Sequence, residues 1–111
     1  MTSRRVVLRD EQTSRDRRVL TAYLDVDGSL ILEGQDLGPG TSLVSSDGEY
    51  EWWRTIRAEH LDRLVALLGG ETGDIDLLDL LETRWSGVAS YELESLIAES
   101  GIPNKLDVWS G

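Results

Sequence analysis

The sequence predicts an α+β protein, with an antiparallel β-sheet of about four to five strands and about three helices packed on one face. Two observations predict this class. Runs of alternating apolar and polar residues, typical of strands, fill much of the first half of the chain. Segments with apolar residues at every third or fourth position, typical of helices, follow in the second half. At 111 residues the chain has the length of one domain, so we expect a single domain over residues 1–111.

The clearest element is a β-hairpin in residues 19–34, whose turn contains Gly28. With a two-residue loop, Ala22 and Leu24 of the first strand would lie beside Ile31 and the charged Glu33 of the second strand. A three-residue loop, residues 26–28, places Gly28 in the left-handed conformation and pairs Leu24 with Leu30. One face of the hairpin is then wholly apolar, so we predict the three-residue loop.

The flanking segments complete the predicted sheet. Residues 4–9 are a short strand-like run, and the charged residues 9–18 connect this run to the hairpin. Residues 34–48 are rich in glycine and short polar residues, so we predict a long connection there. Residues 49–56 are predicted as a third core strand and residues 105–110 as the last strand.

Three short helices are predicted between these last two strands. The first lies within residues 57–70, with apolar residues at positions 61, 64, 65 and 68, and ends at two glycines, which readily terminate helices. The second begins with Asp74 as its N-cap and carries an apolar stripe. The third begins with Ser90 as its N-cap and stops before Pro103.

The third core strand contains two adjacent tryptophans, Trp52 and Trp53, which point to opposite faces of a sheet. Trp53 shares its face with Glu49 and Glu51, and burying unpaired carboxylates costs several kcal/mol each. We therefore expect Trp52 to enter the core and Trp53 to point outwards. The inward set is Tyr50, Trp52, Arg54 and Ile56.

Trp53 is predicted to be the centre of a partner-binding surface. Tyr23 and Ile31 lie opposite each other on the outward face of the hairpin, and Trp53 joins them if the third strand lies alongside. Carboxylates surround this group, and an aromatic centre within a polar rim is typical of interface hot spots. Two alternatives stay open: another segment covers Trp53, or the face forms a homodimer with a second copy of the chain. The predicted partner-binding residues are Tyr23, Ile31, Trp53, Asp25, Glu33, Glu49 and Glu51.

Composition narrows the class of partner. The formal net charge of −10 repels phosphate groups, so we expect a basic protein partner and no nucleic acid; solubility alone is the other explanation of the charge. The longest apolar run is too short to span a membrane and the N-terminus has no secretory signal, so we expect a cytoplasmic bacterial protein without a membrane partner. With no cysteine and one histidine, the chain is expected to hold neither a metal nor a cofactor.

Other motifs do not predict an enzyme, and we assign no catalytic residue. Residues 25–33 begin like a calcium loop, but Leu30 stands where that loop needs glycine. His60 has no second histidine or nucleophile with it, so we expect a solvated helix residue. The alternative class is a small carboxylate-dependent enzyme or metal-binding protein that uses Gln35, Asp36 and neighbouring acids. A deep pocket beside these residues would favour that class.

Three stretches carry a resemblance to other proteins: GQDLG at residues 34–38, the aromatic strand YEWW at residues 50–53, and GIPNKLDVWS at residues 101–110. Together they resemble a family of small bacterial, actinobacterial-like hypothetical proteins. This resemblance implies no activity and no catalytic residue. In size, charge and class the chain is also similar to immunity proteins of bacterial toxin systems, which implies an immunity- or antitoxin-like role.

Overall fold

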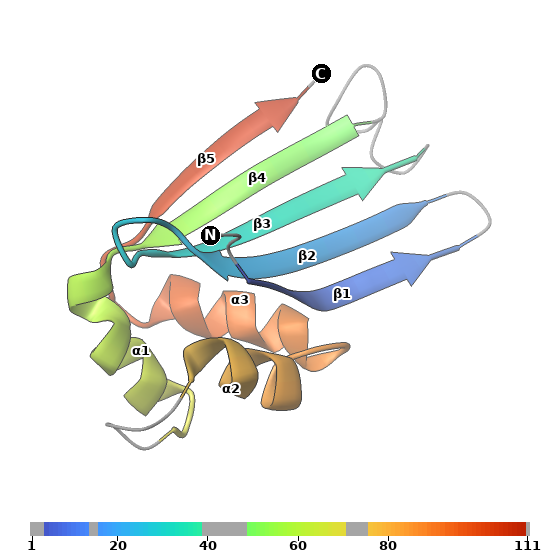
Figure 1. Cartoon of the computed structure of the whole chain (residues 1–111). Helices are drawn as coiled ribbons and strands as arrows, with labels where there is room; N and C mark the ends of the chain where they lie inside the picture. Colours follow the sequence, from blue (N-terminus) through green and yellow to red (C-terminus); the bar gives the residue numbers. More distant parts are fainter. Residues whose placement is uncertain (1–3, 14–15, 39–48, 71–75, 111) are drawn as a thin grey trace.

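The computed structural model describes residues 4–13, 16–38, 49–70 and 76–110, which form one five-stranded antiparallel sheet and three α-helices (Figure 1). The predicted α+β class is confirmed. The strand order is β1-β2-β3-β4-β5, so each strand pairs with its neighbours in the sequence. The bounds are Arg5–Gln12 for β1, Arg17–Leu24 for β2, Leu30–Leu37 for β3, Glu49–Ile56 for β4 and Lys105–Ser110 for β5.

All three α-helices lie on one side of the sheet, and Figure 1 shows α2 and α3 beside β1 and β2, with α1 at the end of the sheet where β4 stops. Helix α1 ends as predicted, because Gly69 adopts a positive φ of 83° that stops the helix. The helices are α1 at Leu61–Leu67, α2 at Leu77–Arg84 and α3 at Ala89–Glu99, and a 3-10 turn at Ala58–His60 precedes α1.

The predicted register of the hairpin is confirmed. Leu24 on β2 lies opposite Leu30 on β3, and the pairing continues without a shift along both strands. Gly28 has a φ of 86°, and its N–H donates to the carbonyl oxygen of Asp25 at 2.9 Å. This is the left-handed turn position that favours glycine, so the turn and the alternation of side chains select the same register.

Strand β1 is longer than predicted, and the charged connection after it is shorter. The strand runs to Gln12, so residues 9–12 pair with β2 instead of belonging to a loop. Charged side chains are tolerated in this strand because only one face of the sheet is covered. A bulge between Val7 and Arg9 shifts the register, and both Leu8 and Arg9 are buried.

Strand β3 also extends further than predicted. Its pairing with β4 continues to Leu37, so residues 34–37 belong to the strand and not to a connection. Residues 39–48, the rest of the predicted connection, lie outside the described residues. Strands β3 and β4 therefore pair through Gly34, a residue that the sequence reasoning assigns to the connection.

The predicted cap of α3 is wrong, and α2 has a cap that the sequence reasoning does not choose. Asp76 is the N-cap of α2, because its carboxylate accepts the N–H groups of Leu78 at 2.9 Å and Asp79 at 3.3 Å. The predicted cap, Asp74, lies outside the described residues. Ser90 lies inside α3, where its hydroxyl donates to a main-chain carbonyl three residues earlier.

The hydrophobic core fills the space between the helices and the first three strands. Ile56, at the end of β4, also belongs to it. Strand β5 contributes nothing to this core: Leu106 and Val108 face the helix side of the sheet but are 48% and 51% exposed. The helices therefore cover only part of the sheet. The buried strand residues of the core are Val6, Leu8, Leu20, Ala22, Leu30, Leu32 and Ile56.

Trp52 points to the helix side of the sheet, as predicted, but the helices leave it only half-buried. It is therefore not the fully buried core residue that the sequence predicts. Its ring packs against that of Tyr50, with centroids 5.8 Å apart, and lies across Gly34 on β3. A Cβ at Gly34 would lie 2.1 Å from the Cε2 and Cζ2 atoms of Trp52. The close approach of the ring thus requires glycine at this position.

We expect Gly34→Ala to lower the free energy of unfolding by about 1–3 kcal/mol, because the added methyl group displaces the Trp52 ring. Chemical denaturation measures this change. In a Trp52→Ala background the same substitution is expected to be neutral or stabilising, since glycine is unfavourable in a strand that nothing crosses. An equal loss in both backgrounds would show that the tryptophan does not impose the glycine.

Candidate functional site

The candidate site is the face of the sheet opposite the helices, which we call the outer face. The alternation of side chains along the paired strands assigns residues to it. None of the described helices lies over this face (Figure 1), and Val7 and Trp109 on it are 53% and 47% exposed. Its central side chains are Arg5, Thr21, Tyr23, Ile31, Glu33, Gln35, Glu51, Trp53 and Thr55.

The three apolar side chains predicted as anchors share the outer face on adjacent strands. Tyr23 on β2 lies directly opposite Ile31 on β3. Trp53 on β4 lies opposite Glu33, in the next outward-facing row of the sheet. All three are half-buried by their neighbours. The prediction that Trp53 joins Tyr23 and Ile31 on one face is confirmed.

Arg5 and Glu33 connect the two aromatic side chains. The guanidinium carbon of Arg5 lies 4.0 Å from the centroid of the Tyr23 ring, which is a cation–π contact. Arg5 Nη1 donates to Glu33 Oε2 at 2.8 Å, and Trp53 Nε1 donates to Glu33 Oε1 at 3.0 Å. Both carboxylate oxygens of Glu33 are therefore occupied. We call this series of contacts, from Tyr23 through Arg5 and Glu33 to Trp53, the Arg5–Glu33 bridge.

Sequence reasoning does not find Arg5 or Trp109, although both lie on the outer face. The signal for Arg5 is the alternation of outward Arg5 and Val7 with buried Val6 and Leu8, a pattern typical of a strand with one covered face. Trp109 is two residues from Asp107 and four from Lys105, so it shares the outward face of β5 with them.

The four carboxylates predicted to surround the group of Tyr23, Ile31 and Trp53 lie at different distances from Trp53. Asp25 lies at the tip of the hairpin, where its carboxylate accepts the N–H of the next residue. Glu49 opens β4 four residues before Trp53, which places it about 13 Å away along the strand. Glu33 on β3 and Asp107 on β5 lie directly opposite Trp53, and Glu51 precedes it by two residues on the same face of β4. Of the four predicted carboxylates, Glu33 and Glu51 therefore lie nearest Trp53, while Asp25 lies two residues beyond Tyr23. The part of these carboxylates in binding stays a prediction.

A hollow of about 250 Å³ opens on the outer face between the Arg5–Glu33 bridge and Glu51. Its floor contains Val19, Thr21 and Gly34, whose side chains are short or absent, and longer side chains form its walls. Glu51 accepts a hydrogen bond from Gln35 Nε2 at 3.0 Å. Among the described residues no cationic side chain forms an ion pair with Glu51. The hollow is therefore suited to a basic side chain of another molecule.

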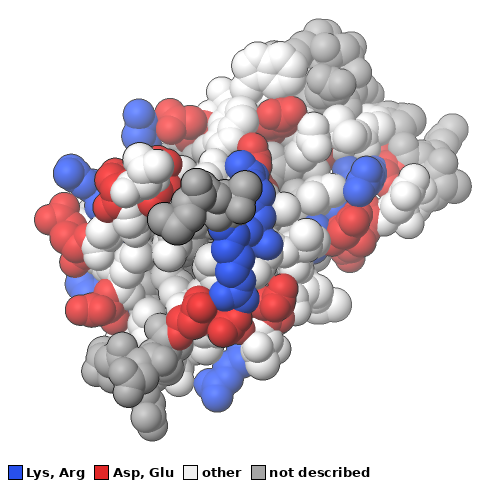
Figure 2. All heavy atoms as spheres, viewed as in Figure 1, with Lys and Arg blue, Asp and Glu red and all other residues white. Residues whose placement is uncertain are grey.

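Acidic charge is not concentrated on the outer face. Figure 2 shows acidic and basic side chains interspersed over the side of the molecule seen in Figure 1. Several outward carboxylates already have cationic partners, and such exposed pairs stabilise a fold by about 0–1 kcal/mol. These pairs are Glu33 with Arg5 at 2.8 Å, Asp10 with Arg17 at 3.3 Å and Asp107 with Lys105 at 3.6 Å.

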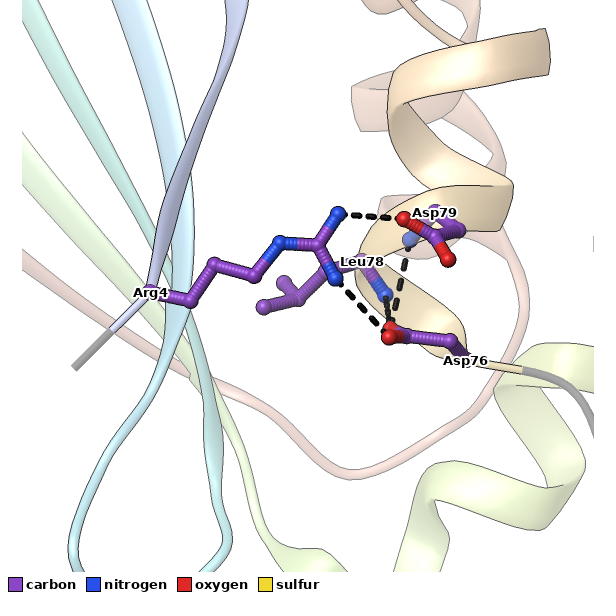
Figure 3. A network of polar contacts seen from close by, with 4 residues as sticks. All are labelled: Arg4, Asp76, Leu78 and Asp79. Carbon is purple, nitrogen blue, oxygen red and sulfur yellow. Dashed lines mark hydrogen bonds and ion pairs between the residues drawn. The ribbon is translucent and has the colours of Figure 1, made fainter.

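Arg4 occupies the acidic stretch at the start of α2 (Figure 3). Its guanidinium donates to Asp76 at 2.8 Å and also to Asp79. Hydrogen bonding to Asp79 and the charges of both carboxylates raise the pKa of Arg4. Because Asp76 also caps α2, the contact ties the start of the chain to the start of this helix. A hollow of about 430 Å³ lies beside these groups, but Arg4 already pairs with both carboxylates.

Arg9 forms a buried polar group between β1 and α3. It is 3% exposed, and its Nε donates to the Ser90 hydroxyl at 2.9 Å. Its Nη2 pairs with Glu94 Oε2 at 2.8 Å, and its guanidinium lies 3.6 Å from the centroid of the Tyr91 ring. All these partners lie on α3, so the group attaches that helix to the edge strand. We assign Arg9 a structural role, because its contacts are satisfied within the chain.

Gln35 and Asp36 do not line one site, because neighbouring residues of β3 point to opposite faces of the sheet. Gln35 faces outwards. Asp36 faces the helix side, where a hollow of about 210 Å³ adjoins it. Burial raises the pKa of Asp36, and its Oδ1 atom accepts no hydrogen bond from the described residues. The placement of the two side chains does not support an enzyme that uses them together.

Comparison of the chain with protein-family models, curated proteins and solved structures gives no match. The resemblances to a bacterial family and to immunity proteins therefore stay predictions. In the part of the chain that the structure describes, no helix is long and apolar enough to cross a lipid bilayer. The same part contains no group of three or more side chains of the kinds that ligate metals.

We expect Asp36→Asn to raise the melting temperature at about pH 7, because burial disfavours the ionised carboxyl group. An acid whose pKa is raised on folding destabilises the folded state above that pKa. The penalty disappears as the pH falls below the ordinary value of 3.8, where the carboxyl group is protonated in both states. Thermal melts from about pH 7 to about pH 3 should therefore show a shrinking gain.

The control for this experiment is Asp62→Asn, which makes the same change in net charge at an exposed position of α1. Its effect on the melting temperature should be small at every pH. A gain from Asp36→Asn that stays constant with pH, or that the control reproduces, would contradict the assignment.

Proposed function

We propose that the outer face binds a protein partner and that the chain is a non-enzymatic interaction module of the bacterial cytoplasm. The observation that carries this proposal is the placement of Tyr23, Ile31 and Trp53 on adjacent strands of a face that no described helix covers. Aromatic side chains within a polar surrounding contribute most of the binding energy in many interfaces. Trp109, exposed on the same face, extends the apolar area towards β5.

The Arg5–Glu33 bridge supports this proposal, because it holds the aromatic side chains in place before a partner arrives. Glu33 fixes the indole of Trp53 by a hydrogen bond, and Arg5 lies against the ring of Tyr23. Side chains that are ordered in the free protein lose less conformational entropy on binding, by about 0.5–1.5 kcal/mol for each one. A rigid aromatic surface is therefore better suited to binding than a mobile one.

The charge of the chain favours a basic partner. A net charge of −10 attracts cationic proteins over a distance and raises their association rate. Close contact then depends on Glu51, whose carboxylate lines the hollow of the outer face without an ion-pair partner among the described residues. A lysine or arginine side chain of the partner fits this position. An immunity- or antitoxin-like role is one version of this function, and its support is the size and charge of the chain.

We expect Trp53→Ala to abolish capture of the partner while the protein stays folded. The substitution removes a half-buried ring and one hydrogen bond, which costs about 1–2 kcal/mol of stability. It also removes the central anchor, which should weaken binding by about 2 kcal/mol or more, roughly thirtyfold. Affinity capture from a lysate of the source bacterium, followed by titration calorimetry with the captured protein, measures the loss.

The matched control is Val88→Ser, which removes an exposed apolar side chain beside α3, away from the outer face. The captured protein should be present with the wild type and with this control, and absent with Trp53→Ala. If Trp53→Ala, shown by circular dichroism to be folded, captures the same protein as strongly as the wild type, the outer face is not the binding surface.

The same complex tests the preference for a basic partner. Its affinity should fall as the salt concentration rises, and Glu51→Gln should reduce that salt dependence. Glu92→Gln makes the same change in charge on α3 and should leave the dependence unchanged. A complex whose affinity does not respond to salt would contradict the electrostatic part of the proposal.

A further inference from the structure

Strand β5 is an open edge of the sheet. It pairs with β4 along one side, and no described strand pairs with its other side. The opposite edge strand, β1, is interrupted by the bulge between Val7 and Arg9, a device that hinders pairing with another chain. Strand β5 has no such irregularity. Its free N–H and C=O groups are therefore available to a further strand.

Apolar side chains on both faces of β5 are exposed. Leu106 and Val108 on the helix side are 48% and 51% exposed, and Trp109 on the outer face is 47% exposed. On the helix side they continue the half-buried surface of Trp52. An edge strand with exposed apolar residues on both faces is a site of strand addition unless charges prevent it.

The charges of β5 are complementary to those of a second copy. Lys105 and Asp107 are its charged residues, and they share one face because they are two residues apart. In an antiparallel pair of β5 strands centred on Leu106, Lys105 of each copy lies opposite Asp107 of the other. Leu106 then lies opposite Leu106 of the second copy. A strand from an unrelated protein would match β5 equally well only if it carried an acidic residue opposite Lys105 and a basic residue opposite Asp107.

We propose that the protein forms a symmetric homodimer in which β5 pairs antiparallel with β5 of a second copy, in the register centred on Leu106. The result is a sheet of ten strands, five from each copy, joined where residues 105–107 of the two β5 strands lie opposite one another. An antiparallel pair has its twofold axis perpendicular to the sheet, so both sets of helices lie on the same side. The two exposed Leu106 side chains then meet at the centre of that side, and each Val108 lies diagonally beside Leu106 of the other copy.

This dimer is independent of the proposed binding function. The outer faces of both copies remain open, so a dimer presents two binding surfaces side by side. Salt separates the two interactions. Each copy carries a net charge of −10, so the two copies repel each other. Salt screens this repulsion, so the dimer should become stronger as the salt concentration rises. Binding of a basic partner should become weaker, because salt screens the attraction.

A charge-swap experiment tests the proposal by sedimentation velocity over a range of protein concentrations. The wild type should change from monomer to dimer as concentration rises. Lys105→Asp and Asp107→Lys each create like charges opposite one another at two symmetric places, so each should weaken the dimer about tenfold or more. The double variant, Lys105→Asp with Asp107→Lys, restores the opposite charges and should dimerise like the wild type. Both side chains are exposed, so the folded monomer tolerates the changes.

Two controls keep the result specific. Asp62→Lys on α1 changes the net charge by the same amount as Asp107→Lys and should not weaken the dimer. Trp53→Ala should not weaken it either, because Trp53 lies on β4 and the two copies meet only through β5. The proposal is overturned if the wild type is monomeric at all concentrations, if the single variants dimerise like the wild type, if the double variant stays as weak as the single ones, or if Trp53→Ala abolishes the dimer.

Discussion

The sheet is larger than the area that the three helices can cover, and most features of the molecule depend on this constraint. The helices contain 7, 8 and 11 residues, which is about 39 Å of helix axis with a width of about 10 Å. Five strands of six to eight residues make a sheet of roughly 24 Å by 26 Å. The helices therefore cover about three fifths of one face. The core forms mainly over β1–β3, and the described residues leave the outer face and β5 open.

An uncovered sheet face must keep its side chains in place by contacts within the face. Cross-strand pairs and exposed ion pairs contribute only about 0–1 kcal/mol each, far less than a buried leucine. The Arg5–Glu33 bridge is of this kind: it orders Tyr23 and Trp53 but adds little to stability. The stability of the fold thus depends mainly on the helix side of the sheet. Residues of the outer face can therefore be substituted with little loss of folding free energy.

The parts of the structure that the sequence predicts are those in which several local signals agree. Gly28 fits one turn position, and the register that uses it also separates apolar from polar side chains, so the hairpin and the face of Trp53 follow. The contact of Arg5 with Glu33 depends on strand order, which periodicity does not determine. The partial burial of Trp52 depends on how far the helices reach across the sheet, which only tertiary packing decides.

The central claim is that the helices leave the β5 side of the sheet uncovered, and the accessibility of methyl groups to a soluble gadolinium chelate tests it most directly. Paramagnetic broadening of methyl resonances is measured in the Lys105→Asp variant, which weakens the proposed dimer, at a concentration where sedimentation velocity shows a monomer. The Leu106 and Val108 methyl groups should broaden as strongly as those of Val7 on the outer face, while the buried methyl groups of Leu32 stay sharp. Protection of Leu106 and Val108 equal to that of Leu32 would contradict the account.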